Sequence, residues 1–389
     1  MMQAMELVYL DNNATTRPAP EVVAAMLPYL TDWYGNPSSV HRFGQRARQA
    51  VDDARAQVAH LIGCAAGELM FTGGGTEAVN TAIRGILQAR APRRRVITTT
   101  VEHSATRELC QQLAREGVDV VLVGVDPLGH LDLGQLEAAL SDETALVTLL
   151  WGNNETGVVL PVEQVSALCR ARRVPLHVDG TQVVGKRPVD VAAAGIDAMS
   201  FAPHKFHGPK GVGCLYLRRG VRMRPLVIGG PHETSRRGGT ENVPGIVGTG
   251  AAAELAAASL PQMAGPVAQL RDRLEREILA RVPQTQVLGD VALRVPNTTN
   301  ISFVRLEADA IVIALSEQGV CVSAGAACSS GSLEPSHVLM AMGLEERVAH
   351  GGIRFSLSKY TTDAEVDRAL EVVPRVIERL RAVLPVGSQ

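Results

Sequence analysis

Short apolar runs alternate with longer amphipathic stretches between about residues 69 and 217. Short runs between polar or glycine-containing segments are typical of buried strands, whereas the longer stretches repeat their apolar positions with a helical period. The predicted strands are ELMF, RVIT, VDVVLV, ALVTLL, PLHV, DAMSF and GCLYL, and the helices between them include residues 76–89, 103–116 and 161–173. This alternation predicts an α/β fold, with a mostly parallel sheet covered by helices on both faces and a ligand site beyond the carboxyl ends of its strands.

The pattern changes after about residue 265, where helices and strands follow each other with less regularity. The run NISFV predicts a strand, ADAIVIALSEQ predicts a helix, and residues 363–383 predict a final helix. A chain of 389 residues is also long for one domain. We therefore predict a large domain over residues 13–260 and a smaller α+β domain formed by residues 1–12 and 261–389.

The composition is that of a soluble protein with a substantial core, since 46% of the residues are apolar and 20% are charged. A formal charge of −2 argues against binding to nucleic acid or to a membrane surface, which normally requires a basic excess. No apolar run approaches the ~18 residues of a membrane span, and the N-terminus lacks the basic and apolar regions of a secretory signal. We expect a cytoplasmic protein with no nucleic-acid or membrane partner.

Six cysteines are scattered along the chain without C-x-x-C spacing, which favours a reducing compartment over a disulfide framework or a zinc site. Cys328 differs from the others, because it lies in the run SAGAACSSGS, whose small residues cannot fill a core. Such a run predicts an exposed loop in which a thiol could act as a nucleophile, although a cysteine without a role would fit the same pattern. The other five have aliphatic neighbours and are expected to be core residues: Cys64, Cys110, Cys169, Cys214 and Cys321.

Asp179 and Lys205 form the most informative pair of polar residues. Asp179 ends the apolar run LHVD, and Lys205 closely follows the run DAMSFA. A lysine at one strand end opposite an aspartate at another suits pyridoxal phosphate (PLP). The amine forms a Schiff base with the cofactor, and the carboxylate keeps the pyridine nitrogen protonated so that the ring can accept electrons. The alternative is a solvated lysine and a capping aspartate.

The segment FTGGGTEAVN, at residues 71–80, predicts a phosphate site. A strand ends here, three glycines follow, and Thr76 and Glu77 begin a helix. Glycines let the backbone approach an anion, and the helix start supplies free amides and a favourable dipole. The segment contains neither the G-K-[ST] of a P-loop nor a G-x-G-x-x-G dinucleotide fingerprint, so it suits a single phosphate group.

Four more polar residues are candidates for the same site. His103 follows the run RVITTT at a helix start, where it could lie against a flat ring or only cap the helix. Asn154 and Gln182 follow two of the strands and could donate to a phenolic oxygen, but turn formation would also account for them. Arg354 lies in the strand-like run GGIRFSLS and could hold a substrate carboxylate with both arms of its guanidinium group.

Motifs along the whole chain resemble those of the cysteine desulfurases, a branch of the class V aminotransferase-like PLP enzymes. They are YLDNNATT, YGNPSSVHRFGQ, FTGGGTE, EH, NNETG, HVDGTQ, HKFHGPKG, RRGGTENV, SSGSLEPSHVL and IRFSLS. Agreement over so many separated motifs is highly specific. In detail the chain is most similar to the nitrogen-fixation-type and housekeeping branch, which has a short cysteine loop. The resemblance implies the fold type I architecture of PLP enzymes.

The resemblance also implies how the cofactor is held. Lys205 would carry PLP, Asp179 would pair with its ring nitrogen, and His103 would stack on the ring and serve catalysis. Thr240, in RRGGT, would reach the phosphate of the cofactor in the other subunit, which implies a homodimer. The remaining cofactor contacts would come from Gly75, Thr76, Asn154, Gln182 and His204.

The same resemblance implies the reaction. Arg354 and Asn154 would bind L-cysteine, and Cys328 would take its sulfur as a persulfide and leave L-alanine. The sulfur would then pass to an iron–sulfur scaffold or another acceptor protein. We expect no resident metal, with only a contact between Cys328 and an iron–sulfur cluster as a candidate. Two other functions stay open: a PLP-dependent selenocysteine lyase or transaminase, and a non-catalytic assembly partner with the same fold.

Two residues beside Lys205 depart from the family pattern. Ala202 stands where relatives usually carry a serine that binds the phosphate, and Pro203 stands where they usually carry alanine. A missing neutral hydrogen bond is worth roughly 0.5–1.5 kcal/mol, so we expect weaker retention of PLP rather than lost activity. The cysteine loop also carries alanines where relatives commonly have serines, and Gly180 replaces the usual alanine after Asp179.

Overall fold

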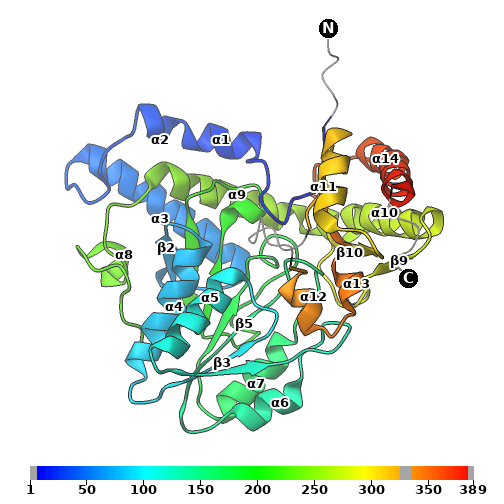
Figure 1. The fold of residues 1–389 in the computed structure, drawn as a ribbon. Coiled ribbons are helices and arrows are strands. Elements are labelled where there is room, and N and C mark those ends of the chain that lie inside the picture. Colours follow the sequence, from blue (N-terminus) through cyan, green and yellow to red (C-terminus); the bar gives the residue numbers. More distant parts are fainter. Residues whose placement is uncertain (1–6, 325–333, 384–389) are drawn as a thin grey trace.

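A seven-stranded sheet forms the centre of the larger lobe of the computed structural model, which describes residues 7–324 and 334–383 (Figure 1). The strands are β2 (Leu69–Thr72), β3 (Arg95–Thr99), β4 (Asp119–Val123), β5 (Thr144–Leu150), β6 (Leu176–Asp179), β7 (Ala198–Phe201) and β8 (Gly213–Leu217). Their order is β2-β8-β7-β6-β5-β3-β4, in which β8 runs antiparallel to β2 and β7 and the other pairs are parallel. The predicted α/β fold with a mostly parallel sheet is confirmed.

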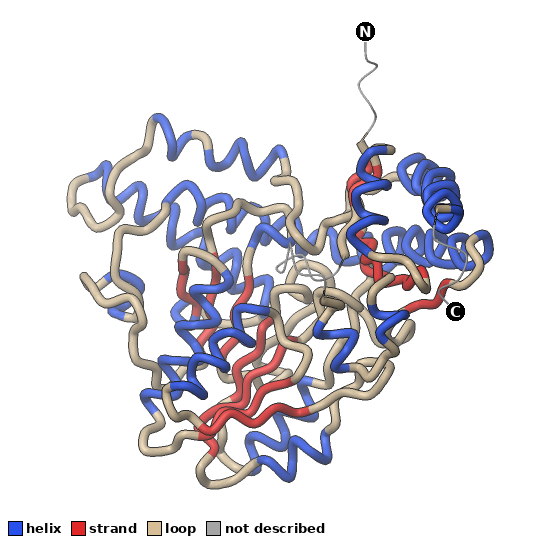
Figure 2. The backbone as a smooth tube through the Cα atoms, viewed as in Figure 1, coloured by secondary structure: helices blue, strands red, loops and turns tan. Residues whose placement is uncertain are grey.

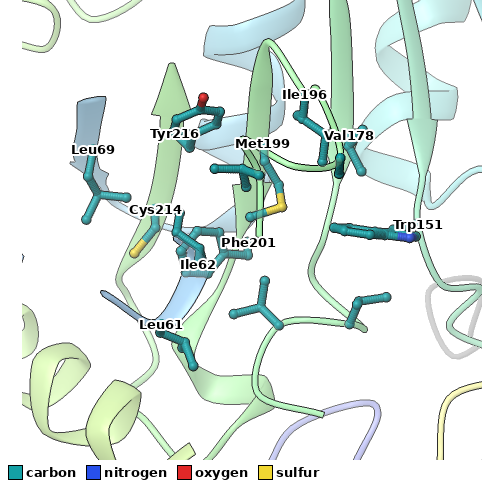
Figure 3. Packing of buried hydrophobic residues seen from close by; sticks show 14 of the residues in the cluster. Leu61, Ile62, Leu69, Trp151, Val178, Ile196, Met199, Phe201, Cys214 and Tyr216 are labelled. Carbon is teal, nitrogen blue, oxygen red and sulfur yellow. The ribbon is translucent and has the colours of Figure 1, made fainter. Parts of the chain in front are cut away.

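Helices cover both faces of this sheet (Figure 2). Neighbouring residues of a strand point to opposite faces. Met199 and Phe201 therefore belong to one apolar cluster, together with Ile62, whereas Ala198 belongs to the cluster on the other face (Figure 3 shows the first cluster). Burial on both faces explains why most of these strands appear in the sequence as continuous apolar runs. The helices of this lobe are α3 (Arg42–Ile62), α4 (Gly75–Ala89), α5 (Ser104–Arg115), α6 (Leu133–Ala139), α7 (Val162–Ala171) and α9 (Val243–Gln262).

The sequence analysis does not predict α3, a helix of 21 residues. The side chain of His41 caps its start by accepting from the N–H of Gly44, and Gly63 ends it with a φ of 70°. Its buried face combines alanines with larger aliphatic residues, so the helix is amphipathic. Small residues allow a close approach to α9, where a Cβ atom on Gly250 would lie 2.7 Å from the Cα of Ala54.

A smaller lobe contains a three-stranded antiparallel sheet, β12-β10-β9, and a parallel pair formed by β1 and β11. Its strands are β1 (Val8–Tyr9), β9 (Thr285–Val287), β10 (Thr298–Phe303), β11 (Val320–Cys321) and β12 (Gly352–Ser356). The helices α10 (Ala268–Arg281), α11 (Ala308–Glu317) and α14 (Asp363–Ala382) pack on these strands around one apolar cluster that includes Val8 and Phe355. The predicted division into two domains stays a prediction.

A long helical segment connects the two lobes. Helix α9 continues into α10 through a π-helical turn over Met263–Val267, next to Pro261 and Pro266, which cannot donate the regular helical hydrogen bonds. The segment Val243–Arg281 is long and apolar enough to cross a membrane by length and composition, but half of its most apolar window is buried inside the protein. Since α9 packs against α1 and α3, it has the character of a core helix.

Short helices and turns complete the described chain and border several loops. They are α1 (Pro20–Met26), α2 (Pro28–Thr31), α8 (His232–Ser235), α12 (His337–Ala341), α13 (Glu346–Ala349), and the 3-10 turns over Ala66–Glu68 and Pro203–Lys205.

The cysteines only partly follow the core prediction. Cys110, Cys169 and Cys214 are buried, as expected. Cys64 and Cys321 are only half-buried, so the prediction is wrong for these two. Burial raises the pKa of the Cys110 and Cys169 thiols to about 12, so neither forms a thiolate at neutral pH. Cys328 lies outside the described residues.

Candidate active site

A cavity of about 310 Å³ lies at the carboxyl ends of β5, β6 and β7, bordered by the starts of α4 and α5. This is the position at which open α/β sheets bind their ligands. The structure brings together on its wall every predicted site residue that it describes except Thr240: Gly75, Thr76, His103, Asn154, Asp179, Gln182, His204, Lys205 and Arg354.

Asp179 and Lys205 reach this cavity from neighbouring parallel strands. Asp179 is the last residue of β6, and its Oδ1 atom accepts from the N–H of Thr181 at 3.0 Å. Lys205 ends the 3-10 turn that follows β7, and its Nζ atom donates to the carbonyl oxygens of Asn13 and Ala14 at 2.8 Å each. The carboxylate and the amine therefore line one cavity. PLP requires both groups, because its ring nitrogen pairs with an acid and its aldehyde carbon reacts with an amine.

The start of α4 forms the predicted anion site. Gly75 and Thr76 line the cavity with the first turn of the helix, whose amides have no partners within the helix. The carboxylate of Glu77, in the same turn, accepts from the N–H of Gly73 at 2.8 Å and pairs with Arg237 at 2.9 Å. Because Arg237 compensates the charge of Glu77, the helix start suits an anion such as a phosphate group.

Ala202 and His204 border the same end of the cavity. A Cβ atom on Gly75 would lie 3.4 Å from the Cβ of Ala202, so a serine hydroxyl at position 202 would stand beside the start of α4. The Nδ1 atom of His204 lies 3.1 Å from Oγ1 of Thr15. Burial, together with nearby lysine cations, lowers the pKa of His204 to about 4. A neutral His204 can therefore offer an anion one N–H but no charge.

His103 is the N-cap of α5 and also lines the cavity; that it lies against a flat ring stays a prediction. Its Nδ1 atom accepts from the N–H of Ala105 at 3.1 Å. This hydrogen bond fixes the ring in one orientation and places the proton of the neutral form on Nε2. The helix cap thus presents a defined edge of the imidazole to the cavity.

Arg354 is a buried cation that joins β12 to the cavity, with only 2% of its surface exposed. Its Nη2 atom pairs with Oδ1 of Asp11 at 2.7 Å, and its Nη1 atom donates to the carbonyl oxygen of Asn154 at 2.9 Å. The Nε atom has no partner within residues 7–324 and 334–383. The guanidinium group therefore retains a donor for an incoming carboxylate.

The sequence analysis assigns no role to Asn13, although this residue lies among the hydrogen bonds of the site. Its carbonyl oxygen accepts from Nζ of Lys205 and from Nε2 of Gln182, at 2.8 and 3.0 Å. Its Nδ2 atom donates to the carbonyl oxygen of Asn154 at 3.2 Å and to Oγ1 of Thr298 at 2.9 Å. The signal in the sequence was the pair of asparagines in YLDNNATT, which follows a short apolar run.

A buried acid precedes His103. Glu102 is 1% exposed; its Oε1 atom accepts from Oγ1 of Thr99 at 2.6 Å and from the N–H of Leu150 at 3.1 Å. Its Oε2 atom has no partner among the residues that the structure describes. Burial, with a smaller contribution from Asp179, raises the pKa of Glu102 to about 8. The carboxyl group is therefore protonated in the folded protein at neutral pH.

We expect Glu102→Gln to flatten the dependence of stability on pH. From about pH 4.5 to about pH 8, the unfolded chain loses the Glu102 proton while the folded protein keeps it. Rising pH therefore weakens the parent protein across this window, by up to roughly 5 kcal/mol, and the loss levels off above it. Urea unfolding of both proteins at pH 5, 6, 7 and 8 measures this. If the free energy of unfolding changed with pH in the same way in parent and variant, the raised pKa of Glu102 would be contradicted.

Thr240 does not line the cavity. It is exposed and borders a separate cavity of about 100 Å³, which Gly73 also lines. Thr240 belongs to a chain segment that also contains Glu233 and Arg237. Its predicted contact with the cofactor of another subunit stays a prediction. The segment is attached to the large lobe by a buried ion pair, because Glu233 accepts from both arms of Arg55 at 2.7 and 2.9 Å and from the N–H of Phe71 at 3.1 Å.

Arg55→Leu is expected to destabilise the protein by about 3–5 kcal/mol, because it leaves the carboxylate of Glu233 buried without a cation. The control is Arg84→Leu, which removes a two-armed pair with Glu116 that is more exposed and 3.0 Å long, and should cost less than about 1 kcal/mol. Urea unfolding at pH 7 compares the two. Equal losses would show that burial of the Arg55–Glu233 pair adds nothing to stability.

Comparisons with known proteins agree with one another. The profile of the aminotransferase class-V family matches residues 8–369. A curated relative from Trichormus azollae, named cysteine desulfurase, is 52% identical over 98% of this chain and 95% of its own length. A solved structure described as a NifS-like protein matches with a TM-score of 0.90 and 37% identity, over 96% of this chain and 100% of that chain. A structure of SspA in complex with cysteine matches with a TM-score of 0.80 and 32% identity, over 91% of this chain and 99% of that chain.

Proposed function

Because this chain belongs to the aminotransferase class-V family and is a cysteine desulfurase, we propose that its cavity binds PLP together with L-cysteine and that Cys328 accepts the sulfur. One observation carries this proposal: an amine, a carboxylate, a helix start and an arginine meet on the wall of one cavity of about 310 Å³. The donor set fits PLP, since each of its charged or polar ends finds a complementary group.

The residues of the large lobe would hold the cofactor. Lys205 would bind it covalently, and the buried carboxylate of Asp179 would keep the ring nitrogen protonated. His103 would lie against the ring in the orientation that its helix cap fixes. The start of α4 and the neutral His204 would bind the phosphate group through N–H donors. Asn154 and Gln182 would face the phenolic oxygen.

Three side chains would then act on the substrate. Arg354 would bind the carboxylate of L-cysteine, and Lys205 would take the proton from its Cα atom. Bound PLP supplies the electron sink for this deprotonation. The thiolate of Cys328 would attack the Sγ atom of the substrate, so that the Cβ–Sγ bond breaks and a sulfur–sulfur bond forms. The Cβ atom takes up a proton, the Cα atom regains the proton that Lys205 removed, and L-alanine leaves.

The setting of this reaction is also part of the proposal. The protein would act in the cytoplasm as a homodimer, in which Thr240 of each subunit completes the phosphate site of the other. The persulfide on Cys328 would be delivered to an iron–sulfur scaffold protein. Support comes from the exposed position of Thr240, at the end of a segment that the Arg55–Glu233 pair holds.

The test is to incubate the purified protein with L-cysteine and to measure L-alanine and protein-bound persulfide by mass spectrometry. We expect one alanine for each sulfur transferred, and a persulfide on Cys328. L-selenocysteine, and L-alanine with a 2-oxo acid, serve as comparison substrates for the lyase and transaminase alternatives. Faster turnover of either, or a 2-oxo acid in place of alanine, would overturn the proposal. A protein that binds no PLP would support the non-catalytic alternative.

A further inference from the structure

Lys186 is a buried lysine next to the cavity, and the sequence analysis assigns it no role. Only 4% of its surface is exposed. Burial, together with the cations of Lys205 and Arg354, lowers the pKa of its amine well below the ordinary value. Within the described chain, no carboxylate counteracts this shift. A buried amine without an acid is costly for stability, which indicates a function for it.

The contacts of Lys186 are specific. Its Nζ atom lies 2.5 Å from Oε1 of Gln182 and 2.7 Å from Oδ1 of Asn13. Gln182 precedes Lys186 by four residues in a turn stabilised by backbone hydrogen bonds, and this brings both side chains to the same side. Either protonation state of the amine retains enough N–H groups for both bonds.

These contacts fix the orientation of the Gln182 amide. The carbonyl oxygen of Asn13 requires a donor, and Nε2 of Gln182 lies 3.0 Å from it, which turns Oε1 toward the amine of Lys186. A flipped amide would set two acceptors against each other on the Asn13 side in either protonation state of Lys186. When the amine is charged, it would also set two donors against each other on the Lys186 side. The second N–H of Nε2 is thereby left for the cavity that Gln182 lines.

We propose that Lys186 is a positioning residue, which holds the NH2 group of Gln182 toward the cavity so that it donates to the phenolic oxygen of PLP. The inference rests on the proposed function, because the proposed function places the phenolic oxygen of PLP on the Gln182 side of the cavity. Lys186 itself touches neither cofactor nor substrate. A lysine that only fills space would be replaceable by methionine, which has a similar length but no donor.

The test compares Lys186→Met, Gln182→Leu and the double variant. We expect Lys186→Met to weaken the binding of PLP to the apoprotein about five- to tenfold, and to change the visible absorbance maximum of the bound cofactor. Gln182→Leu should do the same. The double variant should match Gln182→Leu alone, since Lys186 acts through Gln182. Equilibrium dialysis and absorbance spectroscopy measure both effects, and Lys186→Leu, which also lacks a donor, replaces Lys186→Met if the latter does not fold.

Lys359→Met is the matched control. Lys186 and Lys359 both border a small second cavity next to Lys205, but Lys359 donates to Ser259 instead of Gln182. It should leave the absorbance maximum and the PLP affinity unchanged. An unchanged Lys186→Met protein, or additive effects in the double variant, would overturn the inference while leaving the desulfurase assignment intact. A parent protein that does not bind PLP would instead overturn the proposed function.

Discussion

Replacing Cys328 with alanine is expected to abolish the formation of L-alanine from L-cysteine while the protein keeps its yellow, PLP-bound state. The thiolate is the only group in the proposed reaction that attacks the substrate sulfur, so the Cβ–Sγ bond has no acceptor without it. We expect the rate to fall by at least about a thousandfold, as for other lost nucleophiles. Alanine formation, assayed beside the absorbance spectrum, separates lost chemistry from lost cofactor.

Cys321→Ala provides the control for this experiment. Cys321 is half-buried in β11 and precedes Cys328 by seven positions, but it has no part in the proposed reaction. Its variant should retain the rate of the parent protein. If Cys328→Ala released sulfide and alanine at the parent rate, the role of Cys328 would be wrong, and a lyase that does not need this thiol would become the better interpretation.

Lys205→Ala is expected to remove both the covalent attachment of PLP and the activity. The variant loses the amine that carries the cofactor and the group that takes the Cα proton, so turnover should fall by at least about a thousandfold. The carbonyl oxygens of Asn13 and Ala14 each lose the hydrogen bond from Lys205, and that of Asn13 keeps the one from Gln182, so we expect only a moderate loss of stability. Borohydride reduction followed by peptide mapping measures attachment directly.

The second buried lysine is the internal control for that mapping. In the parent protein, the reduced cofactor should label Lys205 and leave Lys186 unlabelled, because the amine of Lys186 is engaged by Gln182 and Asn13 outside the cavity wall. A label on Lys186 would contradict the assignment of both lysines. If the Lys205→Ala variant were still labelled by the reduced cofactor at full yield, the assignment of Lys205 as the attachment site would also be contradicted.

The sheet was predictable because its strands other than the edge strand β4 are almost entirely buried on both faces, which leaves continuous apolar runs in the sequence. Strand direction is not encoded in such a run, so nothing marked β8 as antiparallel. Helix α3 was missed although it is amphipathic, because the predicted helices of the large lobe were those that alternate with strands after residue 69, and α3 precedes the first of these strands.

The residues of the candidate site likewise fall into those that local sequence patterns predict and those that they do not. Asp179, Lys205 and the start of α4 were predictable, because strand ends and helix starts can be located from local patterns. The residues that hold them were not. Asn13 meets Lys205 across 192 positions, and Arg354 meets Asp11 across 343, and no local pattern encodes contacts of that separation. Lys186 stands in the same short run as Gln182, but only the geometry shows that its amine faces the amide.

The segment from Val8 to Thr16 has a consequence for how the enzyme melts. It pairs with β11, bonds to Ser356 of β12, and then contacts Lys205 and His204 of the large lobe. Neither lobe can release this segment without breaking buried hydrogen bonds of the other. Amide protons of Asn12 and Asn13 should therefore exchange with solvent only when the whole protein unfolds, and heating should give a single cooperative transition rather than two separate ones.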